Sequence, residues 1–152
     1  MKLRKSNYLI DSVLLLVLLL SACSLFPNLS FEDIKGEWEL DSEIVFNTYH
    51  LSSIHLSILE DDESGKKWWD LGWESDDRID WFSSSDSEDA LSEFEGNVYK
   101  GHYVYWQEGE QVSHNITVTF TLSNDGRLTA EFVGDGPLAG LILEQLQKIE
   151  TE

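Results

Sequence analysis

Apolar and polar residues alternate along much of the chain after residue 35. In the segment "GEWELDSEIVF" (residues 36–46), Trp38, Leu40, Ile44 and Phe46 are interleaved with acidic side chains. The same period of two returns in later stretches, at residues 53–59, 66–73, 78–82 and 99–122. A period of two is typical of a β-strand with one buried face. The pattern therefore predicts an all-β domain built from antiparallel strands.

The last third of the chain predicts two hairpins. If "EGEQ" places Glu108 opposite Gln111, then Tyr99, Tyr103 and Phe120 lie on one inward face. Strand pairing of this kind is constrained by the turn and by the buried face together.

The second hairpin turns at "SNDGR". A two-residue Asp-Gly loop would put Phe120 opposite Glu131, an acidic residue on the buried face. A three-residue loop at Asn124–Gly126 instead aligns three apolar pairs, which are Leu122 with Leu128, Phe120 with Ala130 and Val118 with Phe132. We therefore predict the three-residue loop.

Two segments have helical signals. Ser30 begins "SFED", a Ser-x-x-Asp capping pattern that predicts one helical turn. Near the other end, Pro137 suits a first helical position, and apolar residues follow at helical spacing, at Leu138, Leu141, Ile142, Leu146 and Ile149. This spacing predicts a C-terminal amphipathic helix that covers the sheet. Earlier in the chain, residues 83–97 are rich in Ser, Asp and Glu and predict a polar surface loop.

The first 22 residues have the order of a secretory signal peptide. Lys2, Arg4 and Lys5 precede an apolar run from Val13 to Leu20. The run is shorter than the roughly 20 residues that a membrane-spanning helix needs. We therefore expect a cleaved leader rather than a permanent transmembrane helix.

The sequence Leu20-Ser21-Ala22-Cys23 resembles the lipobox of bacterial lipoproteins, whose pattern is Leu, Ala or Ser, Gly or Ala, and Cys. The resemblance implies that Cys23, the only cysteine, receives a diacylglyceryl group, that cleavage occurs before it, and that its new amine is acylated, with palmitate as a typical chain. It also implies a lipid anchor in the bacterial cell envelope. Ser24 favours the outer membrane if the organism is Gram-negative. An ordinary signal peptide with a free cysteine is the alternative.

This reading divides the chain into a signal peptide (1–22), a lipidated tether (23–29) and a single β domain (30–152). The whole chain has 29 acidic and ten basic residues and a net charge of −19. The leader holds three of the basic residues and one of the acidic ones, so the mature chain would have a net charge of −21. Such a surface repels nucleic acid and anionic lipid headgroups.

The order of elements resembles the lipocalin family. Gly36-x-Trp38 opens the first strand as the lipocalin Gly-x-Trp does, and a helical turn precedes it. The resemblance implies an antiparallel up-and-down barrel of about seven to eight strands, closed at one end by Trp38 beneath a basic residue of the last strand. Arg127, beside a turn, is the only basic candidate in the expected last strand. A β-sandwich and a smaller seven-stranded barrel stay open as alternatives.

The residues do not predict an enzyme. No Gly-x-Ser-x-Gly elbow is present, and the one thiol is assigned to lipid. His102 and His114 would face opposite sides of the sheet, so we expect no catalytic residues, no metal site and no cofactor. The acidic clusters Asp61–Glu63 and Asp76, Asp77, Asp80 offer oxygen ligands for calcium but lack EF-hand spacing.

Six tryptophans are more than a small core needs, and they suggest two functions. In the first, the barrel binds a lipid or other small hydrophobic molecule. Its walls would be the inward residues Trp38, Tyr99, Tyr103, Phe120 and Phe132. In the second, the domain is a packed scaffold that binds another envelope component, a protein or glycan, through an acidic and aromatic surface. An eight-stranded barrel is only just wide enough to be filled by its own side chains, which favours the second. The lipocalin-like resemblance and the hydroxyls of Tyr99, Tyr103 and Tyr105 among apolar groups favour the first. We expect the first function and keep the second as the alternative.

Overall fold

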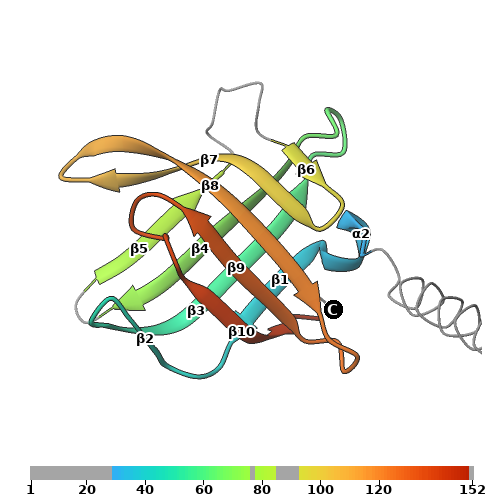
Figure 1. Ribbon diagram of the computed structural model, residues 1–152, viewed down its shortest axis with the longest axis horizontal. Coiled ribbons are helices and arrows are strands. Elements are labelled where there is room, and N and C mark those ends of the chain that lie inside the picture. The colour runs from blue at the N-terminus through green and yellow to red at the C-terminus, as the bar shows by residue number, and fades with distance from the viewer. Residues whose placement is uncertain (1–28, 76–77, 85–92, 151–152) are drawn as a thin grey trace, which may run out of the picture.

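The computed structural model describes residues 29–75, 78–84 and 93–150. The lipobox, the tether up to Asn28 and the cluster residues Asp76 and Asp77 lie outside these residues. The described part contains one helical turn and ten strands (Figure 1). They are α2 (Phe31–Ile34), β1 (Gly36–Leu40), β2 (Ile44–Phe46), β3 (Tyr49–Glu60), β4 (Lys67–Ser75), β5 (Arg78–Ser83), β6 (Glu93–Glu95), β7 (Val98–Gln107), β8 (Glu110–Leu122), β9 (Leu128–Gly134) and β10 (Ile142–Lys148).

Eight of the strands form a closed antiparallel barrel. Each pairs with the next along the chain, in the order β1, β3, β4, β5, β7, β8, β9 and β10, and β10 returns to pair with β1. The short strands β2 and β6 lie outside this circuit, against the first halves of β3 and β7. This confirms the predicted all-β, up-and-down barrel and rules out the sandwich and the seven-stranded alternative. The predicted strand at residues 36–46 is two strands, because the chain leaves the barrel wall after Leu40.

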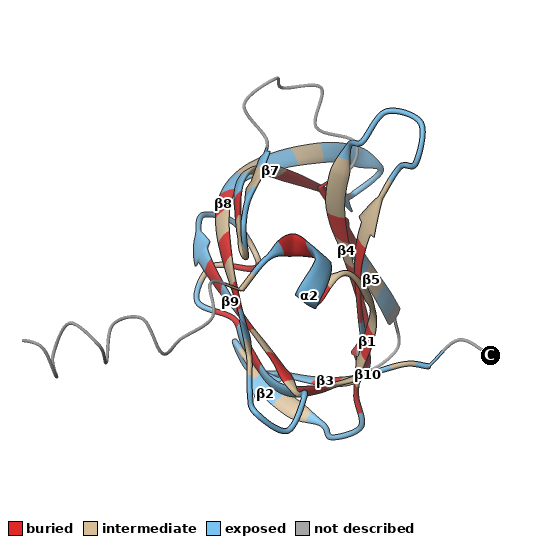
Figure 2. Ribbon diagram, turned by 90° about the vertical axis from the view of Figure 1, so that its right-hand side faces the viewer, coloured by how far each residue is buried: buried red, intermediate tan, exposed pale blue. Residues whose placement is uncertain are grey.

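The helical turn α2 lies across one end of the barrel (Figure 2). The predicted cap is present, since the backbone N–H and the hydroxyl of Ser30 both donate to Asp33 Oδ2, at 2.8 and 2.7 Å. These hydrogen bonds lower the pKa of Asp33. Phe31 and Ile34 point into the barrel and are buried. We call this the closed end.

The Gly-x-Trp segment is built into the closed end. Trp38 is buried, and its indole N–H donates to the carbonyl of Ile34 at 2.8 Å. The ammonium of Lys148, at the end of β10, lies 5.4 Å from the centre of the indole ring, a cation–π distance. Gly36 has φ +137°, and a Cβ there would lie 2.8 Å from the Lys148 side chain. Only glycine suits this position, because it tolerates both the backbone angle and the close approach.

The predicted C-terminal helix is wrong. Residues 142–148 are the strand β10, which closes the barrel between β9 and β1. Its inward residues Leu143 and Leu146 are three apart because a β-bulge shifts the register between them, with Gln145 at φ +66°. A bulge adds one residue to the period of two. The resulting spacing of three imitates that of a helix.

The hairpin between β8 and β9 is the predicted one. Leu122 pairs with Leu128, Phe120 with Ala130 and Val118 with Phe132. The loop is Asn124–Gly126, and Gly126 has φ +79°.

Replacement of Gly126 by valine is expected to lower the free energy of unfolding by about 1 kcal/mol or more. Open space surrounds the position, so the cost comes from the left-handed backbone angle alone, which a β-branched residue adopts poorly. Urea denaturation of both proteins measures it. Gly126→Asn is the matched control and should cost less, because asparagine tolerates this region. Equal losses for valine and asparagine would contradict the explanation.

The hairpin between β7 and β8 differs from the prediction by two residues. Gln107 pairs with Glu110, so the turn is Glu108–Gly109, with both residues at positive φ. Tyr99 therefore lies opposite Val118 and Tyr103 opposite His114. A shift of two residues keeps every side chain on its predicted face, because side chains alternate along a strand.

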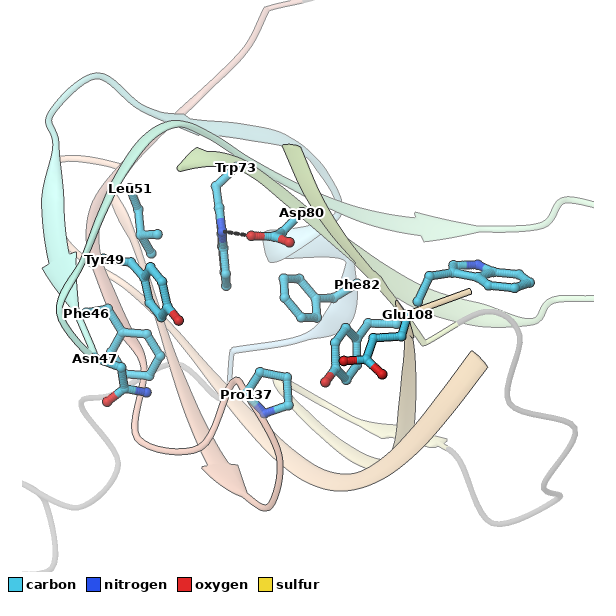
Figure 3. A pocket seen from close by; sticks show the side chains of 11 residues that line it. Phe46, Asn47, Tyr49, Leu51, Trp73, Asp80, Phe82, Glu108 and Pro137 are labelled. Atoms are coloured by element: carbon cyan, nitrogen blue, oxygen red, sulfur yellow. Dashed lines mark hydrogen bonds between the residues drawn. The ribbon is translucent and has the colours of Figure 1, made fainter. Parts of the chain in front are cut away.

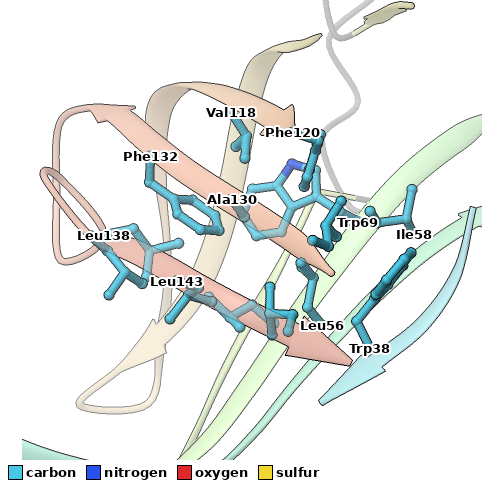
Figure 4. Packing of buried hydrophobic residues seen from close by; sticks show 14 of the residues in the cluster. Trp38, Leu56, Ile58, Trp69, Val118, Phe120, Ala130, Phe132, Leu138 and Leu143 are labelled. Carbon is cyan, nitrogen blue, oxygen red and sulfur yellow. The ribbon is translucent and has the colours of Figure 1, made fainter. Parts of the chain in front are cut away.

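The barrel interior is packed with large apolar side chains (Figure 4). Trp69 is at its centre. Its ring centroid lies 5.5 to 6.0 Å from those of Tyr99, Tyr103 and Phe132. Most of the interior is thus filled by the protein's own side chains, as an eight-stranded barrel allows.

Candidate functional site

The end of the barrel opposite α2 differs from the closed end. The turns at residues 47–48 and 108–109 lie there, with the loop at residues 135–141. Leu138 and Leu141 of this loop are buried in the interior. The hydroxyl of Tyr103 fixes the loop, because it donates to the carbonyl of Asp135 at 3.1 Å and accepts from the backbone N–H of Leu138 at 3.2 Å. Tyr103 is therefore part of the frame of this end, which we call the mouth.

The Tyr103 hydroxyl predicts a pH effect on stability. Burial raises the pKa of Tyr103 to about 12, from an ordinary value of 10. The unfolded chain therefore loses this proton at a lower pH than the folded protein does. The contribution of the neutral hydroxyl to the free energy of unfolding is complete below pH 10 and is lost as the pH rises from 10 to 12. Tyr103→Phe leaves the buried Leu138 N–H without its acceptor, and we expect a loss of about 1 to 3 kcal/mol at pH 7. The stability gap between the two proteins should narrow between pH 10 and 12, as measured by urea denaturation. A gap that stays constant over that range would contradict a buried, neutral phenol.

The five ligand-binding residues predicted from the sequence all point inward, as expected. Each is at most 1% exposed, namely Trp38, Tyr99, Tyr103, Phe120 and Phe132. They belong to the packed core, and none of them lines the cavity described below. The hydroxyl of Tyr99 is also engaged within the core, where it donates to the carbonyl of His102 at 2.7 Å.

The mouth contains a cavity of about 450 Å³, here called the mouth pocket (Figure 3). This size suits a small organic ligand. Residues from β2, β3, β4, β5, β7 and the mouth loops line it, namely Phe46, Asn47, Tyr49, Leu51, Trp73, Asp80, Phe82, Tyr105, Trp106, Glu108 and Pro137.

The floor of the mouth pocket is buried and its rim is exposed. Leu51, Trp73 and Phe82 form the floor and are buried. The rings of Trp73 and Phe82 are in contact, with centroids 4.6 Å apart. At the rim, Tyr49 is 49% and Trp106 69% exposed. A ligand could therefore bury aromatic surface that the protein leaves in water.

Asp80 of β5 adds a carboxylate to the lining of the pocket. It alternates with Phe82 on the inward face, whereas Ile79 and Trp81 point outward and are 74% and 53% exposed. Apolar residues outside and a carboxylate inside invert the usual pattern of a barrel strand. Asp80 Oδ2 accepts hydrogen bonds from the Trp73 indole N–H and the Ser75 hydroxyl, each at 3.2 Å.

A second exposed aromatic feature lies on the outer wall. The edge of the Trp81 six-membered ring packs against Gly72, its cross-strand partner, where a Cβ would come within 2.4 Å of the indole. With Ile79, His55 and Glu74 it borders a shallow groove. We call this the outer ledge.

Among the described residues, no group of three or more histidine, cysteine or carboxylate side chains is arranged to hold a metal ion. Asp61 instead caps its own turn, where its Oδ1 accepts from the N–H and hydroxyl of Ser64, each at 2.7 Å. These hydrogen bonds lower the pKa of Asp61. The described part of the chain also has no helix of the length and apolarity that crossing a membrane requires.

No protein family model matches the chain, and neither a curated protein nor a solved structure matches it.

The sequence reasoning missed the mouth pocket. Its lining comes from five strands and from loops between strands, and barrel closure brings these segments together. One local signal was available in "RIDWF", where the alternation sets Asp80 on the same face as Phe82. A carboxylate at an inward position marks a place where the strand departs from simple core packing.

Proposed function

We propose that this chain is an envelope-anchored, non-enzymatic lipoprotein whose lipocalin-like barrel binds a small hydrophobic molecule in the mouth pocket. The observation that carries the proposal is the aromatic cavity of about 450 Å³ at the end of an otherwise filled barrel. Serine, cysteine, histidine and lysine are absent from its described lining, which suits reversible binding better than covalent catalysis.

The lipocalin-like character is supported by the closed end. The basic residue over the Gly-x-Trp tryptophan is Lys148 of the true last strand, and not Arg127. The helical turn α2 stands before the first strand, as the resemblance implies.

The position of the proposed lipid anchor determines which end of the barrel faces the membrane. The chain enters the domain through α2 at the closed end. A tether of seven residues, 23–29, reaches at most about 25 Å when extended. With Cys23 in the lipid, the closed end lies towards the membrane and the mouth towards the aqueous phase. The ligand would then enter from the aqueous side.

The expected affinity is modest. An apolar ligand that buries about 300 Å² in the mouth pocket gains roughly 7 kcal/mol of transfer free energy before the costs of association. Binding in the micromolar to millimolar range is the expected result.

Two exposed tryptophans test the location of the site. 1-Adamantanol, a neutral and non-fluorescent cage molecule, would be titrated into the lipidated protein in phosphatidylcholine nanodiscs, with empty nanodiscs subtracted. Trp106→Ala, at the mouth pocket, should weaken binding three- to tenfold, because it removes ligand contact worth about 1 kcal/mol. Trp81→Ala, on the outer ledge, is the matched control and should leave binding unchanged. Chemical shift changes in the two-dimensional NMR spectrum measure both. Absence of saturable binding to the wild type would refute the proposal.

A second candidate function is the binding of an envelope glycan or protein by the outer ledge. The specific observation in its favour is Gly72, which leaves room for the edge of the Trp81 indole against the sheet while that side chain stays 53% exposed. Exposed aromatic faces with acidic neighbours suit sugar rings or a partner surface. Pull-down of envelope components that fails with Trp81→Ala and survives with Trp106→Ala would favour this function over the first.

A further inference from the structure

The outer ledge is one end of a row of side chains that crosses four strands. Trp81 of β5 pairs with Gly72 of β4. Gly72 also pairs with His55 of β3, which pairs in turn with Glu39 of β1. These strands lie side by side in the barrel wall (Figure 1). Residues paired across neighbouring strands share one face of a sheet, so an indole, an imidazole and a carboxylate follow one another on the outer wall. We call these four residues the outer row.

Two adjoining hollows follow the outer row. The first has a volume of about 350 Å³, is lined by Trp81 and His55, and is the groove of the outer ledge. The second has a volume of about 340 Å³ and is lined by His55, Glu39 and Asp41. His55 and Ser53 line both hollows. Three strand spacings of roughly 4.8 Å separate the ends of the row, about 14 Å in all. The two hollows together therefore suit a narrow, extended molecule that lies across the strands.

The polar groups along the outer row are open to a ligand. The His55 imidazole is exposed, and neither it nor the Glu39 carboxylate makes a hydrogen bond or ion pair with another residue that the structure describes. Glu37 and Glu74, at the first hollow, each accept a hydrogen bond from one neutral serine hydroxyl. A carboxylate has about four lone-pair sites, so these groups can accept further hydrogen bonds. The described lining of the hollows contains no lysine or arginine. The charge of this wall thus favours a ligand that brings hydroxyl donors and no negative charge.

We infer that the outer row binds an extended, uncharged oligosaccharide of β-linked hexoses, with one ring against the Trp81 indole and the hydroxyls of the next rings on His55 and Glu39. This inference rests on the second candidate function, names the ligand class of the outer ledge, and is independent of the mouth pocket. A hexose ring with equatorial substituents has a flat C–H face, which the negative face of an aromatic ring attracts. Its hydroxyls point sideways, where they can donate charge-assisted hydrogen bonds to carboxylates.

A protein partner fits this wall less well. A standard protein interface buries about 800 Å² on each partner, around an apolar centre in which glutamate and aspartate are depleted. Ile79 and Trp81 are the exposed large apolar side chains in the described lining of the hollows. The carboxylates of Glu37, Glu39 and Glu74 lie beside them. The observations therefore favour a neutral sugar chain over a protein surface.

Oligosaccharides of graded length test the inference. Glucose, cellobiose, cellotriose and cellotetraose would be titrated at pH 7 into the lipidated protein in phosphatidylcholine nanodiscs, with empty nanodiscs subtracted and the indole N–H signals followed by NMR. One hexose ring is about as long as one strand spacing, so the affinity should rise at least about threefold with each ring up to the trisaccharide, and less than about twofold for the fourth. Affinity that does not depend on length would overturn the inference.

The charge of the sugar gives a second measurement. Cellotetraose oxidised to a carboxylate at every C6 has the same backbone and one negative charge on each ring. It should bind at least about tenfold more weakly than neutral cellotetraose, because the carboxylates of the wall repel it. Equal or tighter binding of the oxidised tetramer would overturn the assignment to an uncharged sugar.

Two pairs of variants assign the binding to the outer row. Trp81→Ala should weaken cellotetraose binding at least about tenfold, whereas Trp68→Ala, on the outer face of β4 but outside the described lining, should leave it within about twofold. Glu39→Ala should weaken binding about three- to tenfold, whereas Glu131→Ala, at an exposed position of β9, should leave it within about twofold. Urea denaturation should show that all four variants are folded. Equal losses in a variant and its control would overturn the role of the outer row.

The outcomes separate this inference from the proposals beside it. If no sugar binds and the capture of an envelope protein depends on Trp81, the inference fails and the second candidate function stands in its protein form. If neither sugar nor protein binds at Trp81, both fail. Saturating cellotetraose should leave the binding of 1-adamantanol at the mouth pocket unchanged, so the first proposed function is tested independently of either outcome.

Discussion

Replacement of Trp69 by alanine is expected to lower the free energy of unfolding by about 3 to 5 kcal/mol, the usual range for a large aromatic residue removed from a core. Trp69 is fully buried, and its ring contacts the rings of Tyr99, Tyr103 and Phe132 from the other side of the barrel. The surrounding rings are carried by paired strands and cannot collapse into the space. The loss is a large part of the 5 to 15 kcal/mol that typically stabilises a domain.

The neighbouring tryptophan provides the control. Trp68 points to the opposite face of β4, is only partly buried, and donates its indole N–H to Asp70 at 3.1 Å. Trp68→Ala should cost less than about 1.5 kcal/mol, because it removes surface contacts and leaves no internal cavity. Urea denaturation of the three proteins measures the difference. Similar losses for the two variants would show that Trp69 is not the centre of the core.

The period of two was sufficient to predict the inward faces of β1, β3, β4, β7, β8 and β9, but it did not predict β10 as a strand. Trp69, Leu71 and Trp73 lie on one face as expected, and adjacent Trp68 and Trp69 face opposite ways. The three-residue turn at Asn124–Gly126 was also predictable, because the alternative would have buried Glu131. Local pattern and buried face gave the same answer in these places, and prediction succeeded there.

The helix predicted in place of β10 and the shifted register of the β7–β8 hairpin have different physical causes. At β10, a bulge gave a strand the spacing of a helix, and only barrel closure shows that residues 142–148 must pair with both β9 and β1. At the β7–β8 hairpin, Glu108 and Gly109 both adopt positive φ, which the sequence "EGEQ" does not specify for a glutamate. Neither error changed which side chains point inward on β7 and β8.

The site was harder to predict than the fold. Inward-facing aromatics at Tyr99, Tyr103, Phe120 and Phe132 were correctly placed in the interior, yet inward orientation does not distinguish a core residue from a cavity wall. That distinction depends on how deeply Leu138 and Leu141 of the 135–141 loop enter the barrel. Both leucines belong to the buried core, and the cavity is lined by β2, β3, β4, β5 and β7 together with Pro137 of the same loop.

Replacement of Cys23 by alanine is expected to abolish lipid attachment entirely. The chain has no other cysteine that could take a diacylglyceryl group. Each buried methylene of an acyl chain contributes about 0.8 kcal/mol to membrane binding, so one chain gives reversible attachment and two or three give a lasting anchor. Loss of all acyl chains therefore lowers the affinity of the protein for the membrane by many orders of magnitude.

The readout for Cys23→Ala must not depend on membrane fractionation alone, because an uncleaved leader would itself hold the protein at the membrane. Incorporation of radiolabelled palmitate and the intact mass of the purified protein are the two measurements. The wild type should carry label and begin at residue 23, whereas the variant should carry none. Ala22→Gly keeps the lipobox pattern and is the matched control, which should be labelled and cleaved like the wild type. Label that persists in Cys23→Ala would overturn the anchor, and with it the orientation that turns the closed end to the membrane and the mouth to the aqueous phase.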